Sequence, residues 1–223
     1  MNSNETKANF RSFNPDILEP ELRVKWDGLI QNIREMQRVA VAFSGGVDSG
    51  TLAAAAYIAL GDNMLAVTIH SPVESPEDTE IARQLAATVG FPHLVLEHND
   101  LEDPNFAANP PDRCYHCKFV RLGVIQQAAA ARGMRYLLEG SNADDRSDYR
   151  PGMRAVRELS GRSPLMEANL SKPEVRALAK AMGLPIWDRP SSPCLASRFP
   201  YGSPITQEGL RKVAAGETVL RQL

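Results

Sequence analysis

The feature that most constrains the fold is a short apolar run that ends in two glycines. Val39 to Phe43 is continuously apolar and too short for a helix of its own, so it predicts a strand buried on both faces. Ser44-Gly45-Gly46 ends the run, and the alanine- and leucine-rich segment 48–60 predicts a helix that is closed by Gly61. Strand, tight loop and helix in succession are the building unit of a parallel sheet.

The same alternation continues along the chain. The expected elements are an amphipathic helix from Pro20, strands over 64–69, 93–97 and 136–139, and helices over 75–90, 117–132, 171–182 and 206–220. Ser75 and Ser171 predict helix N-caps, and Glu174 completes a capping box with Ser171. The pattern predicts an α/β fold with a doubly wound parallel sheet, plus a smaller C-terminal segment.

Size and charge restrict the class of protein. A chain of 223 residues with 43% hydrophobic residues is long enough for one large domain, and its net charge is −2. That balance gives no long-range attraction for nucleic acid or anionic membrane. The polar segment 1–14 is not a signal peptide, and no apolar run has the roughly 18 residues that span a bilayer. We expect a cytoplasmic protein whose partners are small molecules.

We divide the chain into three parts. An N-terminal arm and helix occupy 1–37, and an α/β domain occupies 38–184. The third part, 185–223, contains an aperiodic loop with one cysteine and the start of a C-terminal region.

The loop after the first strand carries the strongest chemical signal. Gly45 and Gly46 let backbone amides approach an anion at the positive end of the following helix, and Ser44 and Ser49 add hydroxyl donors. Asp48 would repel a phosphate unless it binds a cation that the phosphate also binds, which implies Mg²⁺. The P-loop and dinucleotide-binding patterns are absent. An ordinary serine-capped turn is the alternative.

The three cysteines form a second signal. Cys114 and Cys117 are separated by two residues, so both sulfurs can face one centre, and Cys194 lies in a proline-bounded loop. The odd number argues against a disulfide framework and favours a reducing compartment. An iron–sulfur cluster, a zinc site with His116, a redox pair and free thiols all remain open.

Ser-Gly-Gly-Val-Asp-Ser after Ala-Val-Ala-Phe resembles the PP-loop of N-type ATP pyrophosphatases. These enzymes have an adenine nucleotide α-hydrolase-like (HUP) fold, split ATP between the α and β phosphates and adenylylate a carbonyl or carboxylate oxygen. The resemblance makes 38–184 the PP-loop domain and implies that Asp48 takes part in catalysis and binds Mg²⁺. The ATP-binding residues that it implies are Ala42, Ser44, Gly45, Gly46, Asp48, Ser49, Thr68, His70, Ser71 and Gly140.

The wider chain resembles the LarE family of ATP-dependent sulfur transferases, which make the precursor of the nickel-pincer cofactor of lactate racemase. The matching segments are 109–118, 139–145, Tyr149-Arg150-Pro151-Gly152, Trp187-Asp188-Arg189-Pro190, Cys194-Leu195-Ala196-Ser197-Arg198 and Pro200-Tyr201-Gly202. The resemblance implies ATP, Mg²⁺ and a pyridinium mononucleotide as ligands, a sulfide or other sulfur donor, and a homo-oligomer.

Members of that family differ in their cysteines. Some have only the counterpart of Cys194 and sacrifice its sulfur, whereas others add the CxxC pair and hold a [4Fe-4S] cluster. With Cys114, Cys117 and Cys194 all present, this chain resembles the second type. Cys194 is then catalytic, and three protein ligands leave one iron open for an exogenous sulfide.

The resemblance also suggests cations for the substrate. Arg113, Lys118, Arg150 and Arg198 lie near the matching motifs and are expected to bind a phosphorylated, carboxylated mononucleotide, although each alone could be a solvated surface residue. The family usually continues with a basic, strand-rich tail, so we expect this C-terminus to be truncated.

Three rival functions remain. A PP-loop tRNA thiolase would use the same loop and cysteines but would need an RNA-binding surface. An amide-forming ligase of the NAD or GMP synthetase kind would need the loop and no cysteine. A non-catalytic nucleotide-binding module would consume no ATP.

Overall fold

The structure, a computed structural model, describes residue 10 and residues 13–146 and 151–221. The described residues form one parallel sheet of four strands, which lie in the order β3-β2-β1-β4. The strands are β1 (Val39–Ala42), β2 (Met64–His70), β3 (His93–Glu97) and β4 (Tyr136–Leu138). Val39 pairs with Met64 on one side and with Tyr136 on the other, which places β1 in the interior of the sheet.

The strand order contains a switch point at β1. From β1 the chain adds β2 and then β3 on one side, and it later returns to place β4 on the other side. In open α/β sheets, ligands bind at the carboxyl ends of the strands beside such a switch point. The loops that follow β1 and β4 therefore border the expected ligand site.

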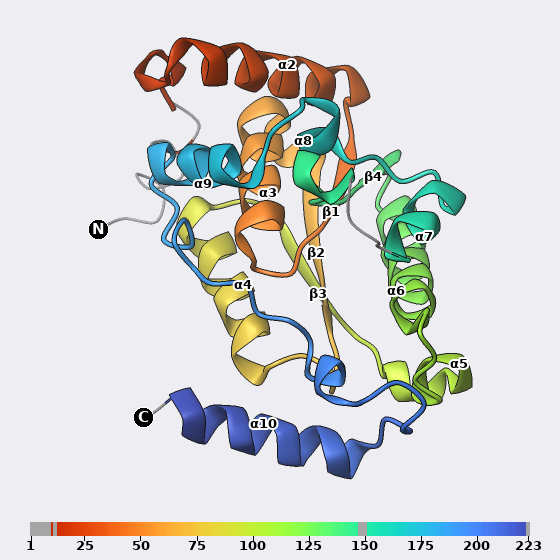
Figure 1. The fold of residues 1–223 in the computed structure, drawn as a ribbon. Helices are drawn as coiled ribbons and strands as arrows, with labels where there is room; N and C mark the ends of the chain where they lie inside the picture. The colour runs from red at the N-terminus through yellow and green to blue at the C-terminus, as the bar shows by residue number, and fades with distance from the viewer. Residues whose placement is uncertain (1–9, 11–12, 147–150, 222–223) are drawn as a thin grey trace.

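Helices cover both faces of the sheet (Figure 1). One face packs on α6 and α7, and the other shares a core with α2, α3, α4, α8 and α9. The bounds are α2 (Pro20–Met36), α3 (Val47–Leu60), α4 (Pro76–Val89), α5 (Pro104–Ala107), α6 (Arg113–Ala130), α7 (Gly152–Glu158), α8 (Pro164–Glu167), α9 (Lys172–Ala181) and α10 (Gln207–Arg221). The predicted doubly wound α/β fold is confirmed. Among the described helices, none is long and apolar enough to cross a membrane.

Short 3-10 helices join several of these elements. They are η1 (Pro15–Ile17), η2 (Gly61–Asn63), η3 (Asp100–Glu102), η4 (Ala143–Arg146) and η5 (Leu195–Arg198).

Strand β1 is buried on both faces, as the apolar run predicts. Val39 and Val41 belong to the core that contains α3, whereas Ala40 belongs to the core that contains α6. The two-residue period of a strand sends neighbouring side chains to opposite faces, so an unbroken apolar run satisfies both.

Helix α6 begins earlier than the spacing predicts. The sequence predicts a start at Cys117, but the helix starts at Arg113, because the turn after Pro110 already makes the first bonds. The amide of Arg113 donates to the carbonyl of Pro110 over 3.0 Å. The CxxC pair therefore lies within the first turns of a helix and not in the loop before it.

The two predicted N-caps have different outcomes. Ser171 and Glu174 form the full capping box at the start of α9, as predicted. Ser75 occupies the N-cap position of α4, as predicted, although its side chain makes no capping hydrogen bond. Gly90 ends α4 in the left-handed conformation, with φ of 89°.

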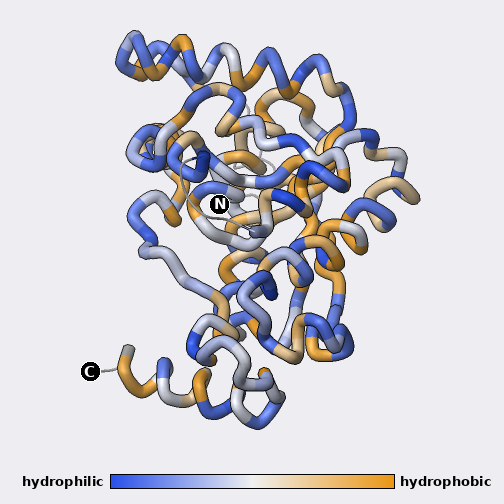
Figure 2. The backbone as a smooth tube through the Cα atoms, turned by 45° about the vertical axis from the view of Figure 1, so that its right-hand side comes forward, coloured by the Kyte–Doolittle hydropathy of each residue, from blue (hydrophilic) through white to orange (hydrophobic). Residues whose placement is uncertain are grey.

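The C-terminal segment packs against the loops that follow β2 and β3 through a small apolar cluster, separate from the two cores of the sheet. Leu195, Ile205 and Leu210 join Val73 and Phe106 in an apolar cluster. Helix α10 alternates hydrophobic and hydrophilic residues along its length, as the lower part of Figure 2 shows. This cluster attaches the cysteine-containing loop to the loops that follow β2 and β3.

Two helical glycines give a test of the packing of α3. A Cβ on Gly50 would meet Ile186 and would lie 2.9 Å from Cδ2 of Leu85, whereas a Cβ on Gly123 in α6 meets nothing within 4 Å. We expect Gly50→Ala to lower the free energy of unfolding by roughly 1–3 kcal/mol through overpacking. Gly123→Ala, the control, should raise it by about 0.5–1 kcal/mol through helix propensity. Urea denaturation measures both, and equal stabilisation by the two variants would contradict this packing.

Candidate active site

The loop between β1 and α3 is held in shape by its own serines. The backbone amide of Ser44 donates to Oγ of Ser49 over 3.2 Å, and the two hydroxyl oxygens lie 3.1 Å apart. Gly45 has a φ of 76°, and a Cβ there would lie 3.1 Å from the backbone nitrogen of Ala82 in α4. The loop therefore packs against α4 by backbone alone, and the amides of the first turn of α3 border it.

The loop after β4 closes on the same place. A Cβ on Gly140 would lie 2.9 Å from the backbone nitrogen of Ser49, so only glycine allows this approach. Gly140 thus borders the PP-loop, and its role in ATP binding stays a prediction.

Next to Gly140, Glu139 is buried in a polar network. Lys118 donates to its Oε2 over 2.7 Å, Ser141 donates over 2.9 Å, and Ser163 donates to Oε1. Burial alone would raise the pKa of Glu139, but the Lys118 ammonium and these hydrogen bonds hold it below its usual value. Lys118, a predicted substrate-binding residue, is used here as the partner of a buried carboxylate.

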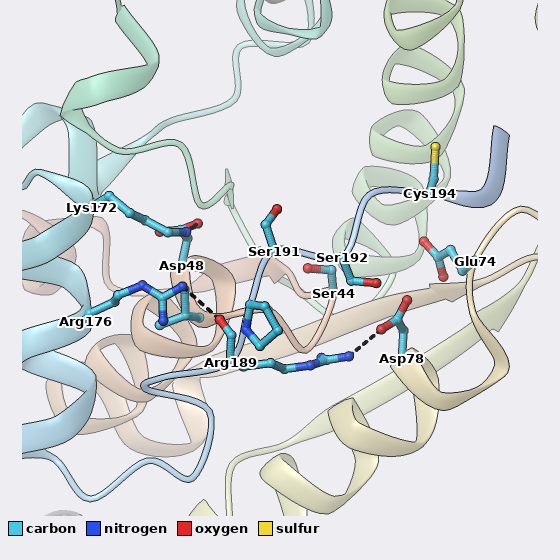
Figure 3. Close-up of a pocket in the computed structure, with 13 residues that line it drawn as sticks. Ser44, Asp48, Glu74, Asp78, Lys172, Arg176, Arg189, Ser191, Ser192 and Cys194 are labelled. Atoms are coloured by element: carbon cyan, nitrogen blue, oxygen red, sulfur yellow. Dashed lines mark hydrogen bonds and ion pairs between the residues drawn. The ribbon is translucent and has the colours of Figure 1, made fainter. Parts of the chain in front are cut away.

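A cavity of about 220 Å³ joins the PP-loop to the third cysteine (Figure 3). Asp48 and Lys172 lie at one end of the view, Cys194 and Glu74 lie at the other, and Ser192 lies between them. The residues that line it are Ser44, Gly46, Val47, Asp48, Glu74, Asp78, Lys172, Arg176, Arg189, Pro190, Ser191, Ser192 and Cys194.

Three of these lining residues are cations that the sequence analysis missed. Lys172 and Arg176 come from α9, and Arg189 comes from the segment that follows. Lys172 forms an ion pair with Asp48. One signal was available, because a lysine in the first turn of a helix opposes the helix dipole and calls for a nearby anion.

The Asp48 carboxylate takes two polar partners. Lys172 pairs with its Oδ2, and Asn142 donates to its Oδ1 over 3.3 Å. Asp144 and Asp145 serve the surrounding backbone, since they accept from the amides of Lys172 and Asn142 respectively over 2.9 Å. The site therefore places the positive charge of Lys172 beside Asp48, and a hard cation such as Mg²⁺ could balance the charge of this carboxylate in the same way.

The cysteines approach one another from two distant segments. Cys114 and Cys194 are exposed, and Cys117 is partly buried, with its Sγ 3.5 Å from Oδ1 of Asp100. Although the side chain of Cys194 reaches solvent, the surrounding protein raises the pKa of its thiol, and Cys114 raises it further. Burial also raises the pKa of Cys117, and Cys194 adds to that effect. Cys194 thus lies within electrostatic reach of both Cys114 and Cys117.

The thiols are not arranged around a single ion. Among the described residues, no group of three or more His, Cys, Asp or Glu side chains could hold a metal ion as placed. Nε2 of His116 lies 3.6 Å from Asp112. The donors nevertheless fit an iron–sulfur cluster in kind, because cysteine thiolates are its usual ligands; four are usual, so these three would leave one iron without a protein ligand.

A buried ion network supports this end of the cavity. Arg121 of α6 donates to Asp100 over 2.7 and 2.9 Å and to Glu74 over 2.5 Å. Burial raises the pKa of Glu74, although Arg121 opposes that shift. Arg121 gave no signal in the sequence, because its partners lie in other segments.

Asn109 and Arg113 hold the end of the cysteine-containing loop. The fully buried Asn109 donates to the carbonyls of Pro200 and Ser203 over 2.8 and 2.9 Å. Arg113 donates to the Asn109 side chain over 2.5 Å, and its guanidinium lies 5.0 Å from the ring centroid of Tyr201. Arg113 is therefore a buried brace and does not line the cavity.

The other predicted residues lie at several places. Thr68 is buried and donates to the carbonyl of Phe43 over 2.6 Å, and Ser71 is buried and donates to Asp100. His70 contacts Thr79 over 2.9 Å, and Ala42 ends β1. Arg198 pairs with Glu217 over 2.7 Å. Arg150 lies outside the described residues, and the ligand roles of all of these stay predictions.

The comparisons with known proteins agree with this architecture. The family model of asparagine synthase matches residues 31–146, which contain the sheet and the PP-loop. The sheet order and the loop define the PP-loop class of ATP-using enzymes.

Individual relatives narrow the class. The pyridinium-3,5-bisthiocarboxylic acid mononucleotide synthase of Lactiplantibacillus plantarum is 37% identical, and the match covers 91% of this chain and 74% of that protein. An uncharacterised protein of Synechocystis sp. is 46% identical over 91% of this chain and 75% of its own length. A glutamine-hydrolysing GMP synthase subunit of Pyrococcus abyssi is 26% identical over 86% of this chain and 68% of its own length. The chain belongs to the LarE family and is an ATP-dependent sulfur transferase.

The Asn109 brace gives a test of the site's framework. Asn109→Ala would remove the buried side chain that donates to the carbonyls of Pro200 and Ser203 and accepts from Arg113, and we expect the loss of these hydrogen bonds to lower the free energy of unfolding by about 1–3 kcal/mol. Asn105→Ala, at an exposed position of α5, is the matched control and should change the free energy of unfolding by less than about 0.5 kcal/mol. Thermal and urea denaturation measure both variants. Equal effects would show that the brace carries no stability.

Proposed function

We propose that the enzyme adenylylates a carboxylate of a pyridinium mononucleotide and then replaces AMP with sulfur. The observation that carries this proposal is the cavity that is lined by the PP-loop at one end and by Cys194 at the other (Figure 3). The substrate is proposed from the product that the name of the Lactiplantibacillus plantarum relative gives, a pyridinium bisthiocarboxylic acid mononucleotide.

The PP-loop end suits the first step. The amides at the start of α3 and the hydroxyls of Ser44 and Ser49 bind the ATP phosphates, with Lys172 and Arg176 as nearby cations. A substrate carboxylate oxygen attacks the α-phosphorus, the bond to the oxygen that bridges to the β-phosphate breaks, and pyrophosphate leaves. Asp48 would hold Mg²⁺, which offsets charge on the departing pyrophosphate; one carboxylate suffices because the phosphates supply further ligands.

The Cys194 end suits the second step. Sulfur attacks the acyl carbon, the carbon–oxygen bond to AMP breaks, and a thiocarboxylate forms. Cys114, Cys117 and Cys194 would hold a [4Fe-4S] cluster whose open iron supplies bound sulfide. Support for this ligand set comes from the exposure of Cys114 and Cys194 and from the electrostatic influence between Cys194 and each of the other two thiols.

The two steps can be separated by substitution. We expect pyrophosphate release when ATP, Mg²⁺ and the carboxylated pyridinium mononucleotide are supplied, and Asp48→Asn should reduce that release by roughly a hundredfold. Cys194→Ser should retain ATP–pyrophosphate exchange and lose thiocarboxylate formation. Asp62→Asn, at an exposed position of η2, is the matched control and should behave as the parent protein. Release of ADP and phosphate in place of pyrophosphate would contradict the proposal.

The cluster has its own test. After anaerobic purification or reconstitution, we expect about four iron and four acid-labile sulfide atoms per chain, with both lost in Cys117→Ser. His116→Ala should keep its iron, whereas a Cys₃His zinc site would lose its metal in that variant.

If the purified protein contains no iron and still makes one thiocarboxylate per chain, the cluster mechanism would be wrong and the sacrificial route would take its place. In that route the Cys194 thiolate displaces AMP and forms a thioester with the substrate. Loss of the Cα proton and cleavage of the Cβ–S bond then release the thiocarboxylate and leave dehydroalanine, which mass spectrometry detects as the loss of H₂S from the chain.

A further inference from the structure

We propose that Arg189 is a positioning residue that joins the PP-loop to the segment carrying Cys194, so that the sulfur end of the cavity is set by the ATP end. We name residues 187–194 the strap. This inference rests on the proposed two-step function, because it concerns how the second step follows the first. It concerns a motif, Trp187-Asp188-Arg189-Pro190, whose role the proposed chemistry leaves open.

The guanidinium of Arg189 contacts two elements at once. Its Nη2 donates to Oδ1 of Asp78 over 2.6 Å, in the first turn of α4. Its Nη1 donates to the carbonyl of Gly45 over 3.3 Å, inside the PP-loop. Because one rigid planar group makes both bonds, the strap, α4 and the PP-loop cannot shift independently without breaking one of them.

The carbonyl that accepts from Arg189 has a fixed place. Gly45 has a φ of 76°, and a Cβ there would lie 3.2 Å from the carbonyl oxygen of Asp78 and 3.1 Å from the nitrogen of Ala82. The loop therefore sits directly on the turn of α4 that also presents the Asp78 carboxylate. Arg189 thus binds at the joint between the loop and α4.

The strap depends on such contacts because it has little structure of its own. Arg176 donates to the carbonyls of Trp187 and Arg189 over 2.7 and 2.8 Å, which fixes the beginning of the strap to α9. The next backbone anchor is the amide of Leu195, which donates to the carbonyl of Val73 over 2.9 Å. Most of the segment 190–194 between these anchors is exposed, and Pro190 and Pro193 have no amide hydrogen to donate.

Cys194 is therefore placed by the two ends of the strap. Arg189 sets the PP-loop end, and the anchor at Leu195 sets the other. Loss of the Arg189 clamp frees Cys194 relative to the acyl adenylate while leaving the loop serines and the start of α3 in place. Misplacement of a reacting group by about 1 Å can cost as much as a hundredfold in rate, so the second step should suffer more than the first.

The alternative is that Arg189 binds ATP directly. It lines the cavity, but the structure commits both of its terminal nitrogens to Asp78 and Gly45. Direct binding to phosphate would make the first step the more sensitive one. The two roles are therefore distinguished by which half of the reaction responds.

The test compares Arg189→Gln, Arg189→Lys and Asp78→Asn with the parent protein. Arg23→Gln is the matched control, since Arg23 also bridges two groups, the carboxylates of Asp16 and Asp27, but lies on α2 and does not line the cavity. The readouts are kcat and KM for ATP in pyrophosphate release, and thiocarboxylate formed per pyrophosphate released. We expect KM for ATP to change less than about threefold and the yield per pyrophosphate to fall by roughly tenfold or more in all three variants.

Each other outcome has a defined meaning. An equal fall of both steps, or a rise in KM for ATP alone, would assign Arg189 to phosphate binding and overturn the proposal. An unchanged yield would also overturn it. If Arg189→Gln fails to fold, Asp78→Asn breaks the same clamp from α4 and decides the question. Absence of pyrophosphate release from the parent protein would instead refute the proposed function.

Discussion

The close approach of backbone to backbone around the PP-loop is the constraint on which the rest of the structure depends. Gly45 lies against α4 in the left-handed conformation, which strains any other residue, and Gly140 lies so close to the start of α3 that a side chain would force the backbone to shift. With these contacts made, the amides at the start of α3 and the carboxyl ends of β1 and β4 border one cavity. A larger residue at either position would separate the elements that form the ATP end of the site.

Charge is organised around this packing. Lys172 stands at the start of a helix, where the helix dipole disfavours it, and its ion pair with Asp48 compensates for that position. Arg189 likewise pairs with Asp78, and Arg121 with Asp100 and Glu74. Lys172 and Arg189 thus line the cavity as cations that already have carboxylate partners. Such an arrangement holds each cation at a fixed place beside the cavity.

The sulfur end is built in a different way. Cys194 lies in an exposed segment, so its place is set by contacts on either side of it: the Arg189 clamp before it, and the Asn109 brace after it. Helix α6 contributes Cys114 and Cys117 from its first turns, next to the Arg121 network. Polar contacts and the apolar cluster around Leu195 and Phe106 therefore bring the cysteine-bearing segments together.

The sequence by itself determined the parallel α/β fold, the PP-loop and the family, because strand and helix periods and a six-residue loop are local properties of the chain. It also singled out Cys194 and the CxxC pair as candidate residues for the sulfur chemistry. Only the tertiary structure decided which side chains share the cavity: Lys172, Arg176 and Arg189 come from segments far from the loop in sequence. The tertiary structure likewise placed Arg113 in a buried brace and buried the side chain of Thr68 in β2. The physical reason is that pairing of charges and burial of polar groups depend on contacts between distant segments, which no local pattern encodes.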